Sequence, residues 1–166
     1  MPSIIYQQQQ LLGVIQNVQL FYRQSLAIDV RRLASNNDIQ LVAPPLKESF
    51  AGLATSTRSD LGYLAGNIKI IKDLTWTNTA KILAHEYFHL YSAYRNLNLK
   101  HTHEEGAAQL VAYLWLRSRP TIQSRYCQHV MAADPNHIYG VHFRKALYIY
   151  EQSKGFRDFL KRWSSQ

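Results

Sequence analysis

The sequence has almost no cysteine and no long apolar run. Cys127 is the only cysteine among 166 residues, which excludes an internal disulfide and a cysteine-based zinc cluster. No stretch of about 18 or more consecutive apolar residues is present, so we expect no membrane-spanning helix. The first residues lack the basic start, apolar core and cleavage site of a secretion signal. We therefore expect a cytoplasmic protein in a reducing compartment.

Acidic residues are scarce in the last fifty positions. Residues 117–166 carry nine Lys and Arg against three Asp and Glu, which gives this segment +6 of the net charge of +8. Such a basic segment is compatible with nucleic acid, an anionic membrane or an acidic protein as a partner. No nucleic-acid-binding motif accompanies it, so nucleic acid is not the favoured partner. We expect these side chains to lie on the solvated faces of two helices.

One short motif carries recognisable chemistry, His85-Glu86-x-x-His89. A helix turns by about 100° per residue, so His85 and His89 lie on one face, where two imidazoles can bind one metal ion. Glu86 lies beside that face and can accept a proton from a metal-activated water without being a ligand itself. A helix is indicated because apolar residues recur at helical spacing through the motif, at Leu83, Tyr87, Leu90, Tyr91 and Tyr94.

A catalytic zinc ion needs a third protein ligand and an open position for water. The metzincin pattern is excluded because position 92 is serine and position 95 is arginine, where that pattern has glycine and histidine. The remaining candidates follow the motif closely: His101, His103, Glu104 and Glu105. We expect both histidines to be ordinary surface residues.

Glu104 and Glu105 both fall in the first turn of the next predicted helix. Glu105 has an alternative role, because Thr102-His103-Glu104-Glu105 fits a capping box in which Glu105 reaches back to the helix N-terminus. Gly106 and the two alanines that follow it indicate a close approach of another element. A close approach of this kind would bring a carboxylate of this helix to the histidine pair. The spacing alone does not decide whether Glu104 or Glu105 is the third ligand.

The remaining pattern predicts a mostly helical α+β domain that spans residues 1–166. The predicted helices are 6–22, the metal-binding helix with Thr77 or Asn78 as its cap, 103–117, 122–133, 135–152 and 155–163. Short strands are predicted at 26–30, 39–42 and 67–74, and residues 47–66 are predicted to be mostly loop. We expect a small antiparallel sheet beside the metal-binding helix, with the strand at 67–74 offering its edge to an extended substrate. Residues 1–66 would form an N-terminal helix and sheet portion, and residues 67–166 the catalytic core with the C-terminal helices.

Three segments together resemble one family of zinc peptidases. They are Ile82-Leu83-Ala84-His85-Glu86-x-x-His89, Glu104-Glu105-Gly106-x-x-Gln109-x-x-Ala112-x-x-Trp115-Leu116, and Tyr139-Gly140-x-x-Phe143-Arg144. They are similar to the peptidase domain of the DA-one family, plant organ-size regulators that carry LIM domains and a C-terminal gluzincin-type zinc peptidase. The likeness extends over about residues 67–147.

The resemblance implies a gluzincin fold with zinc held by His85, His89 and a glutamate. Gluzincins that read Asn-Glu-Gly use the glutamate directly before the glycine, which falls on Glu105. The third segment is implied to lie near the site, so Tyr139 and His142 are candidates for the group that stabilises the oxyanion. His142 stands where the family has glycine. The sequence contains no LIM domain and no ubiquitin-interacting segment, so we do not expect the family's ubiquitin-linked activation.

The sequence thus predicts a zinc-dependent endopeptidase with one Zn²⁺ per chain and a protein or peptide as its substrate. Glu86 would be the general base, and Tyr139 or His142 would stabilise the oxyanion. Two other functions remain open. One is a nucleic-acid-associated metallopeptidase that uses the basic C-terminal surface. The other is a catalytically idle zinc-binding interaction module.

Overall fold

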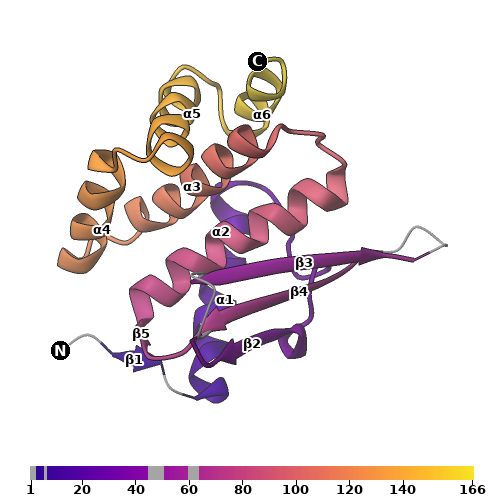
Figure 1. Cartoon of the computed structure of the whole chain (residues 1–166), viewed down its shortest axis with the longest axis vertical. Coiled ribbons are helices and arrows are strands. Elements are labelled where there is room, and N and C mark those ends of the chain that lie inside the picture. Colours follow the sequence, from indigo (N-terminus) through magenta and orange to yellow (C-terminus); the bar gives the residue numbers. More distant parts are fainter. Residues whose placement is uncertain (1–2, 6, 45–50, 60–63) are drawn as a thin grey trace.

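The computed structural model describes residues 3–5, 7–44, 51–59 and 64–166. Over these residues the chain is a mostly helical α+β structure with six α-helices, as predicted, and it has two small sheets where one was predicted. The helix α2 (Trp76–Arg95) lies between the sheet on one side and the helices α3 to α6 on the other (Figure 1). Among the described residues, no helix has the length and apolar character needed to cross a membrane.

The larger sheet has three strands in the order β2 (Ile39–Val42), β4 (Leu64–Ile71), β3 (Gly52–Arg58). The central strand pairs with β2 in parallel and with β3 in the antiparallel direction. The predicted antiparallel sheet is therefore wrong for β2. The central position of β4 follows from its alternation, because Ile68 and Ile70 are fully buried on one face.

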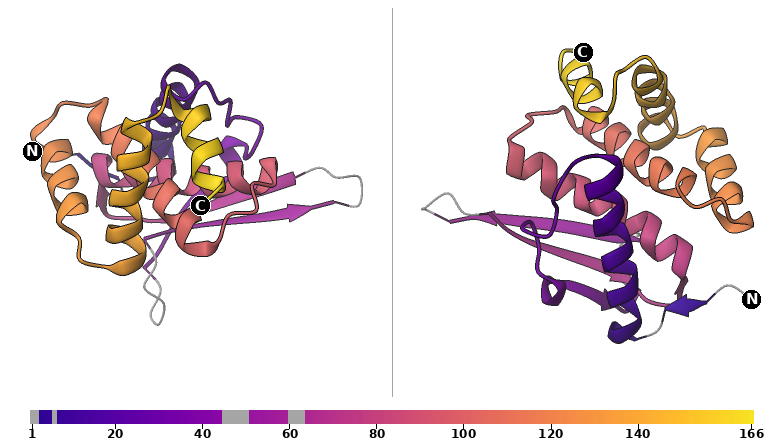
Figure 2. Two further views of the ribbon diagram at one scale, coloured as in Figure 1. Left: turned by 90° about the horizontal axis from the view of Figure 1, so that it is seen from above. Right: turned by 180° about the vertical axis from the view of Figure 1, so that it is seen from behind.

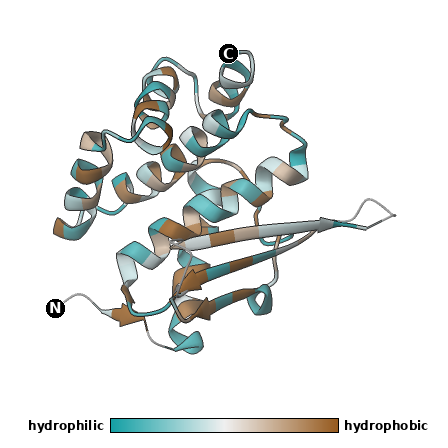
Figure 3. Cartoon of the chain, in the orientation of Figure 1, coloured by the Kyte–Doolittle hydropathy of each residue, from teal (hydrophilic) through white to brown (hydrophobic). Residues whose placement is uncertain are grey.

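The strand β3 occupies part of the segment that was predicted to be mostly loop, and β4 begins in it. That prediction is therefore wrong for residues 52–58 and 64–66. Residues 47–50 and 60–63 of that predicted loop lie outside the described residues. Most of β3 is exposed, and Figure 3 shows it largely in the pale colours of near-neutral residues. An edge strand that is mostly exposed carries too few apolar residues to be predicted from hydrophobic alternation.

Two very short strands fix the beginning of α2. The strand β5 (Leu74–Thr75) pairs antiparallel with β1 (Ile4–Ile5), close to the start of the chain. The predicted strand 67–74 is thus divided, because Asp73 has a left-handed backbone (φ 67°) between β4 and β5. The N-cap of α2 is Thr75, whose hydroxyl accepts a hydrogen bond from the Asn78 amide, and not Thr77 or Asn78 as predicted.

The helix α1 (Gln8–Ser25) supports the metal-binding helix from behind, as the rear view in Figure 2 shows. It confirms the predicted first helix from residue 8 onward; residue 6, where that prediction begins, lies outside the described residues. The Tyr22 hydroxyl donates a 2.6 Å hydrogen bond to the carbonyl of Ala84, the residue before His85. Residues 26–30 form no strand, contrary to prediction, and Ala27 there has a left-handed backbone with φ 55°. A 3₁₀ turn, η1 (Asn36–Asp38), leads into β2.

The C-terminal half is helical, with α3 (His101–Arg117), α4 (Ile122–Ala133), α5 (His142–Glu151) and α6 (Phe156–Ser164). These confirm the predictions for 103–117, 122–133 and 155–163 within two residues. The predicted helix 135–152 begins instead with a π-helical turn, η2 (His137–Val141), capped by Asn136. The last helix is tied to α3 by a 2.8 Å hydrogen bond from the Trp163 indole to the His103 carbonyl.

Candidate metal centre

The two histidines of the motif face the same point in space. Both lie on α2, four residues apart, and their Nε2 atoms are 3.1 Å apart. The opposite face of α2 is fully buried through residues such as Ala80, Leu83 and Tyr87, so the helix cannot rotate without losing its core contacts. Packing of α2 therefore fixes the direction of both imidazoles.

Glu105 approaches this histidine pair from the first turns of α3. One carboxylate oxygen, Oε2, lies 3.2 Å from His85 Nε2, and the other, Oε1, lies 3.5 Å from His89 Nε2. The N-cap of α3 is Lys100 and no side chain caps the helix, so the capping-box alternative for Glu105 is not what the structure shows. The side chain of Glu105 is only 12% exposed, directed inward to the histidines.

The spacing of these donor atoms suits a metal ion. One ligand atom from each of the three residues can be chosen so that all lie within 4.8 Å of one another. The two imidazole nitrogens are 3.1 Å apart, and each lies 3.2 or 3.5 Å from one of the two Glu105 oxygens, close to the roughly 3.3–3.6 Å between the ligands of a tetrahedral zinc with bonds of about 2.0–2.2 Å. Glu105 Oε2 is also a buried acceptor without a hydrogen bond of proper geometry, which is unfavourable unless a cation balances it. Within the described residues, His85, His89 and Glu105 are the one group of three that could hold a metal ion.

Glu104 has a different place from its neighbour. Its Oε1 lies 3.5 Å from Nδ1 of His89, the ring nitrogen that faces away from the other two donors. This contact with His89 lowers the pKa of Glu104, and burial only partly opposes it. Burial alone would lower the pKa of His89, but the contact with Glu104 and the charges of Glu105 and Glu86 outweigh it and raise that pKa. A carboxylate at this nitrogen is the arrangement that orients a metal-binding histidine.

Glu86 lies beside the histidine pair and is 7% exposed. Its Oε2 accepts a 2.8 Å hydrogen bond from the backbone amide of Ala54 on β3. Burial raises the pKa of Glu86, and the histidines and the Ala54 amide oppose that effect. The carboxylate is therefore held in one orientation and has an increased affinity for a proton.

The close approach of β3 to Glu86 depends on Gly52. A Cβ atom at this position would lie 2.7 Å from Glu86 Oε1 and 2.4 Å from a methyl group of Ile82. Any other residue would therefore displace the carboxylate or the strand. Sequence analysis missed both Gly52 and Ala54, because their segment was predicted to be loop.

A cleft of about 480 Å³ contains these groups. Its walls come from β3, α2, α3 and η2, through Gly52, Leu53, Ala54, Ser56, His85, Glu86, His89, Leu90, Ala93, Glu104, Glu105 and Tyr139. The strand at its rim is β3, not the predicted strand at 67–74, which corresponds largely to β4. That strand is paired on both edges and cannot accept another strand.

The free edge of β3 is turned toward the cleft. The Ala51 carbonyl bonds to the Ile71 amide, so the backbone groups of Ala51 point to β4. Backbone direction alternates along a strand, and the groups of Gly52, Ala54 and Ser56 therefore point away from β4. The bond from the Ala54 amide to Glu86 agrees with this alternation.

Tyr139 lies at the cleft and His142 does not. Tyr139 lines the cleft from η2, and burial together with the charges of Glu105 and Glu86 raises its pKa. The His142 ring packs between His103 and His137, with ring centroids 5.5 and 5.1 Å away. Gly106 permits this packing, since a Cβ there would lie 2.9 Å from the His142 carbonyl oxygen. The small residue predicted to allow a close approach therefore serves the start of α5.

The rest of the third sequence segment holds η2 in place. A Cβ at Gly140 would overlap the Asp134 backbone, so only glycine permits this contact. Arg144 donates to the Asp134 and Ala132 carbonyls at 2.7 and 3.2 Å, which joins the end of α4 to α5. Together these contacts set the position of Tyr139 at the cleft.

The two histidines that were expected to be surface residues differ. His101 is 72% exposed and lies 3.8 Å from Glu105 at the edge of the site, as a surface residue would. His103 is only 9% exposed, and its ring packs against Trp163 at 4.8 Å between centroids. The expectation of a surface position is thus wrong for His103, because α6 covers it.

Comparison with known families agrees with this geometry. Residues 52–125 match the DA1-like family, described as Protein DA1. The match runs from β3 through α2 and the whole of α3 to the first turn of α4. It therefore includes Glu86 and the three candidate ligands, but it ends before Tyr139. Comparisons with curated proteins and with solved structures found no match. The similarity read from the sequence is confirmed as far as residue 125: residues 52–125 carry a DA1-like domain.

Proposed function

We propose that this protein is a zinc-dependent endopeptidase of the gluzincin type. The observation that carries the proposal is the convergence of His85, His89 and Glu105 beside a buried Glu86, in a cleft bordered by the free edge of a strand. DA1-like proteins are known as peptidases, which supports the same reaction. Two imidazoles and one carboxylate are a donor set that suits zinc.

The three ligands would hold the ion, and Glu104 would orient His89 through its Nδ1. A zinc ion bound there would supply Lewis acidity, which lowers the pKa of a water in its open position toward neutrality. Glu86 then accepts a proton from the water that attacks the scissile carbonyl and returns it to the leaving amine. The hydrogen bond from Ala54 fixes Oε2, so the proton is exchanged at Oε1, on the side of Gly52.

The substrate would bind as an added strand along β3. Its backbone can pair with the outward groups of Gly52 and Ser56 and with the Ala54 carbonyl, since the Ala54 amide is already bonded to Glu86. Such pairing places a peptide in extended form across the metal centre. It requires no particular side chain, so the specificity of cleavage would come from the cleft walls.

Tyr139 is the candidate for oxyanion stabilisation. Its phenol is protonated at neutral pH and lines the cleft, so it can donate a hydrogen bond to the substrate carbonyl oxygen as negative charge develops there. His142 is no longer the equal alternative, because its ring packs against His103 and His137 and is not among the residues that line the cleft.

The proposal is tested by incubating zinc-loaded protein with a mixture of quenched fluorescent peptides of random sequence. Wild-type protein should cleave a subset of them, and Glu86→Gln should bind zinc equally well yet leave all peptides intact. Cleavage by Glu86→Gln at the wild-type rate would contradict the assignment of the general base. Zinc-loaded wild-type protein that cleaves no peptide and no unfolded protein would favour the idle binding module.

A further inference from the structure

A second groove lies on the other side of α2 from the metal centre. Its volume is about 620 Å³, and it is formed by the end of α2, by α6 and by residues 27–29 after α1. An adjoining hollow of about 320 Å³ shares Ile28, Tyr91, Arg157 and Leu160 with it, so the two form one continuous groove. The groove has no lining residue in common with the catalytic cleft.

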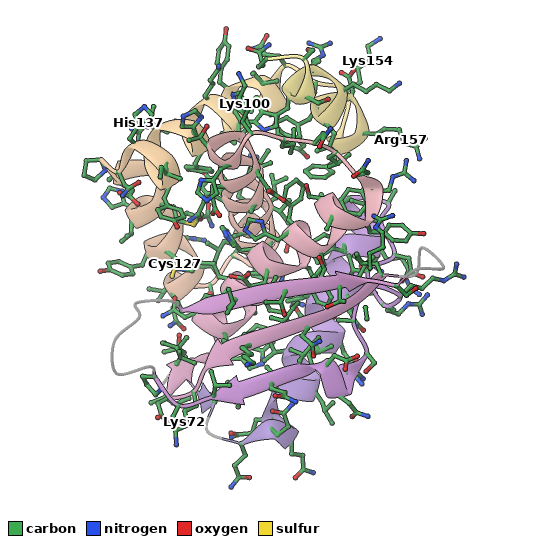
Figure 4. All side chains as sticks on the ribbon, turned by 45° about the vertical axis from the view of Figure 1, so that its right-hand side comes forward. Lys72, Lys100, Cys127, His137, Lys154 and Arg157 are labelled. Atoms are coloured by element: carbon green, nitrogen blue, oxygen red, sulfur yellow. The ribbon has the colours of Figure 1, made fainter. Side chains whose placement is uncertain are left out.

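Three cationic side chains line the groove from two sides. Arg95 comes from α2, and Arg157 and Lys161 come from α6. Within the part of the chain that the structure describes, none of the three has a carboxylate partner within ion-pair distance. Figure 4 shows Arg157 and Lys154 extending outward near the start of α6, far from Lys72 at the opposite end of the molecule.

The carboxylates of the groove are already neutralised. Asp29 binds Arg31 through both of its oxygens, at 2.6 and 2.9 Å. Asp158 forms an ion pair with Arg162 at 3.1 Å. It also accepts a hydrogen bond from the Lys154 backbone amide at 3.0 Å. The groove is therefore positive, with cations available for a ligand that carries several negative charges.

Two tyrosines accompany these cations. Tyr91 and Tyr94 line the groove from α2, and Tyr94 is 53% exposed next to Arg95. A groove that combines cations with exposed aromatic rings is the arrangement that binds single-stranded nucleic acid, since phosphates contact the cations and unpaired bases stack on the rings. An acidic peptide would use the cations but would gain little from a ring face.

We propose that the groove between α2 and α6 binds single-stranded nucleic acid, with Arg95, Arg157 and Lys161 contacting phosphates and Tyr94 stacking on a base. This binding is separate from the proposed peptidase reaction, because the two sites use different faces of α2. Of the nine basic residues in 117–166, Arg157 and Lys161 line this groove.

The test is fluorescence anisotropy with full-length protein and a labelled single-stranded deoxythymidine oligonucleotide. Non-specific affinities of this kind fall at about 10⁻⁶–10⁻⁴ M, and three phosphate contacts predict roughly 20-fold weaker binding for a fourfold rise in salt. The double variant Arg157→Ala/Lys161→Ala should lose most of this salt dependence. Its matched control, Lys72→Ala/Arg125→Ala, removes the same charge elsewhere and should retain it.

Stacking is tested separately from charge. Loss of one stacked base predicts that Tyr94→Ala weakens binding by roughly 5- to 150-fold, whereas Tyr148→Ala, another exposed tyrosine at 65% exposure, should have no effect. Equal weakening by the two double variants would overturn the proposal. So would an unchanged affinity of Tyr94→Ala together with displacement of the oligonucleotide by polyglutamate, a result that would assign the groove to an acidic peptide.

Discussion

Glu105 Oε2 lies 3.2 Å from His85 Nε2, although the two residues belong to different helices. The candidate metal centre therefore exists only when α3 packs against α2, with Trp115 and Tyr87 in the shared core. A bound metal joins the two helices and should stabilise the fold by an amount that grows with the logarithm of the free metal concentration divided by Kd. The expected result is a melting temperature that rises when zinc is added and falls again with a chelator.

Replacement of Glu104 should weaken the metal site without abolishing it. The Glu104 carboxylate lies 3.5 Å from His89 Nδ1 and orients the His89 imidazole without contacting the metal itself. Removing such a partner typically costs about 10- to 100-fold in metal affinity. Competition between Glu104→Ala and a zinc-binding dye measures this effect, and an affinity equal to wild type would show that His89 needs no such support.

Gly52→Ala should impair catalysis more than stability. The added methyl group would meet Glu86 Oε1 and Ile82, so we expect kcat to fall while the zinc content stays unchanged. Gly13→Ala is the matched control. No atom lies within 4 Å of the added Cβ in α1, and alanine should stabilise that helix by about 0.5–1 kcal/mol. Equal activity of the two variants would contradict the role given to Gly52.

Tyr139→Phe removes one hydroxyl at the cleft and tests its proposed role in catalysis. Loss of an oxyanion donor typically lowers kcat by about 10²- to 10³-fold, with little change in KM or in zinc content. Steady-state kinetics on a peptide from the substrate screen measure the effect. A fall in KM and kcat together, or no change in either, would place Tyr139 among residues that only shape the cleft wall.

Alkaline pH should destabilise the protein through the buried tyrosines. Burial raises the pKa of Tyr87 from 10.0 to about 12, against the lowering effect of Gln19, and the pKa of Tyr22 is raised as well. Because the pKa of Tyr87 is higher in the folded than in the unfolded protein, its protonated hydroxyl contributes to the free energy of unfolding. This contribution is complete below pH 10 and is lost between pH 10 and 12. Two pKa units correspond to about 3 kcal/mol for Tyr87.

Urea unfolding at a series of pH values checks this expectation. Tyr87→Phe cannot ionise, so its free energy of unfolding should fall less steeply above pH 10 than that of wild type. Loss of the Gln19 hydrogen bond costs about 0.5–1.5 kcal/mol at every pH and changes the level, not the slope. Parallel pH curves for the two proteins would contradict the assignment.

The helices and the pairing of His85 with His89 followed from local pattern, whereas the choice of Glu105 as the third ligand came from the family resemblance. Four-residue spacing on a helix needs no tertiary information, and the small residues after Glu105 indicated a close contact. The partner in that contact could not be predicted, because Gly106 accommodates the start of α5 instead of α2. The separate positions of Glu104 and Glu105 also required the actual crossing of α2 and α3.

The strand β3 was the main feature that sequence pattern did not predict. Its alternation of Leu53, Thr55 and Thr57 with smaller residues was a usable signal, but an exposed edge strand has little hydrophobic contrast. Without β3, the sequence could not show that Ala54 holds Glu86 or that the free sheet edge belongs to this strand. The groove between α2 and α6 was hidden for a similar reason, since it joins segments more than sixty residues apart.

The most direct test of the central claim is the zinc content of untagged protein, measured by elemental mass spectrometry on wild type, Glu105→Ala and Glu104→Ala after loading with excess zinc. The geometry predicts about one zinc per chain for wild type and Glu104→Ala and none for Glu105→Ala, because the third ligand is missing. Zinc retained in Glu105→Ala, or a wild-type chain that binds none, would contradict the assignment of His85, His89 and Glu105 as a metal centre.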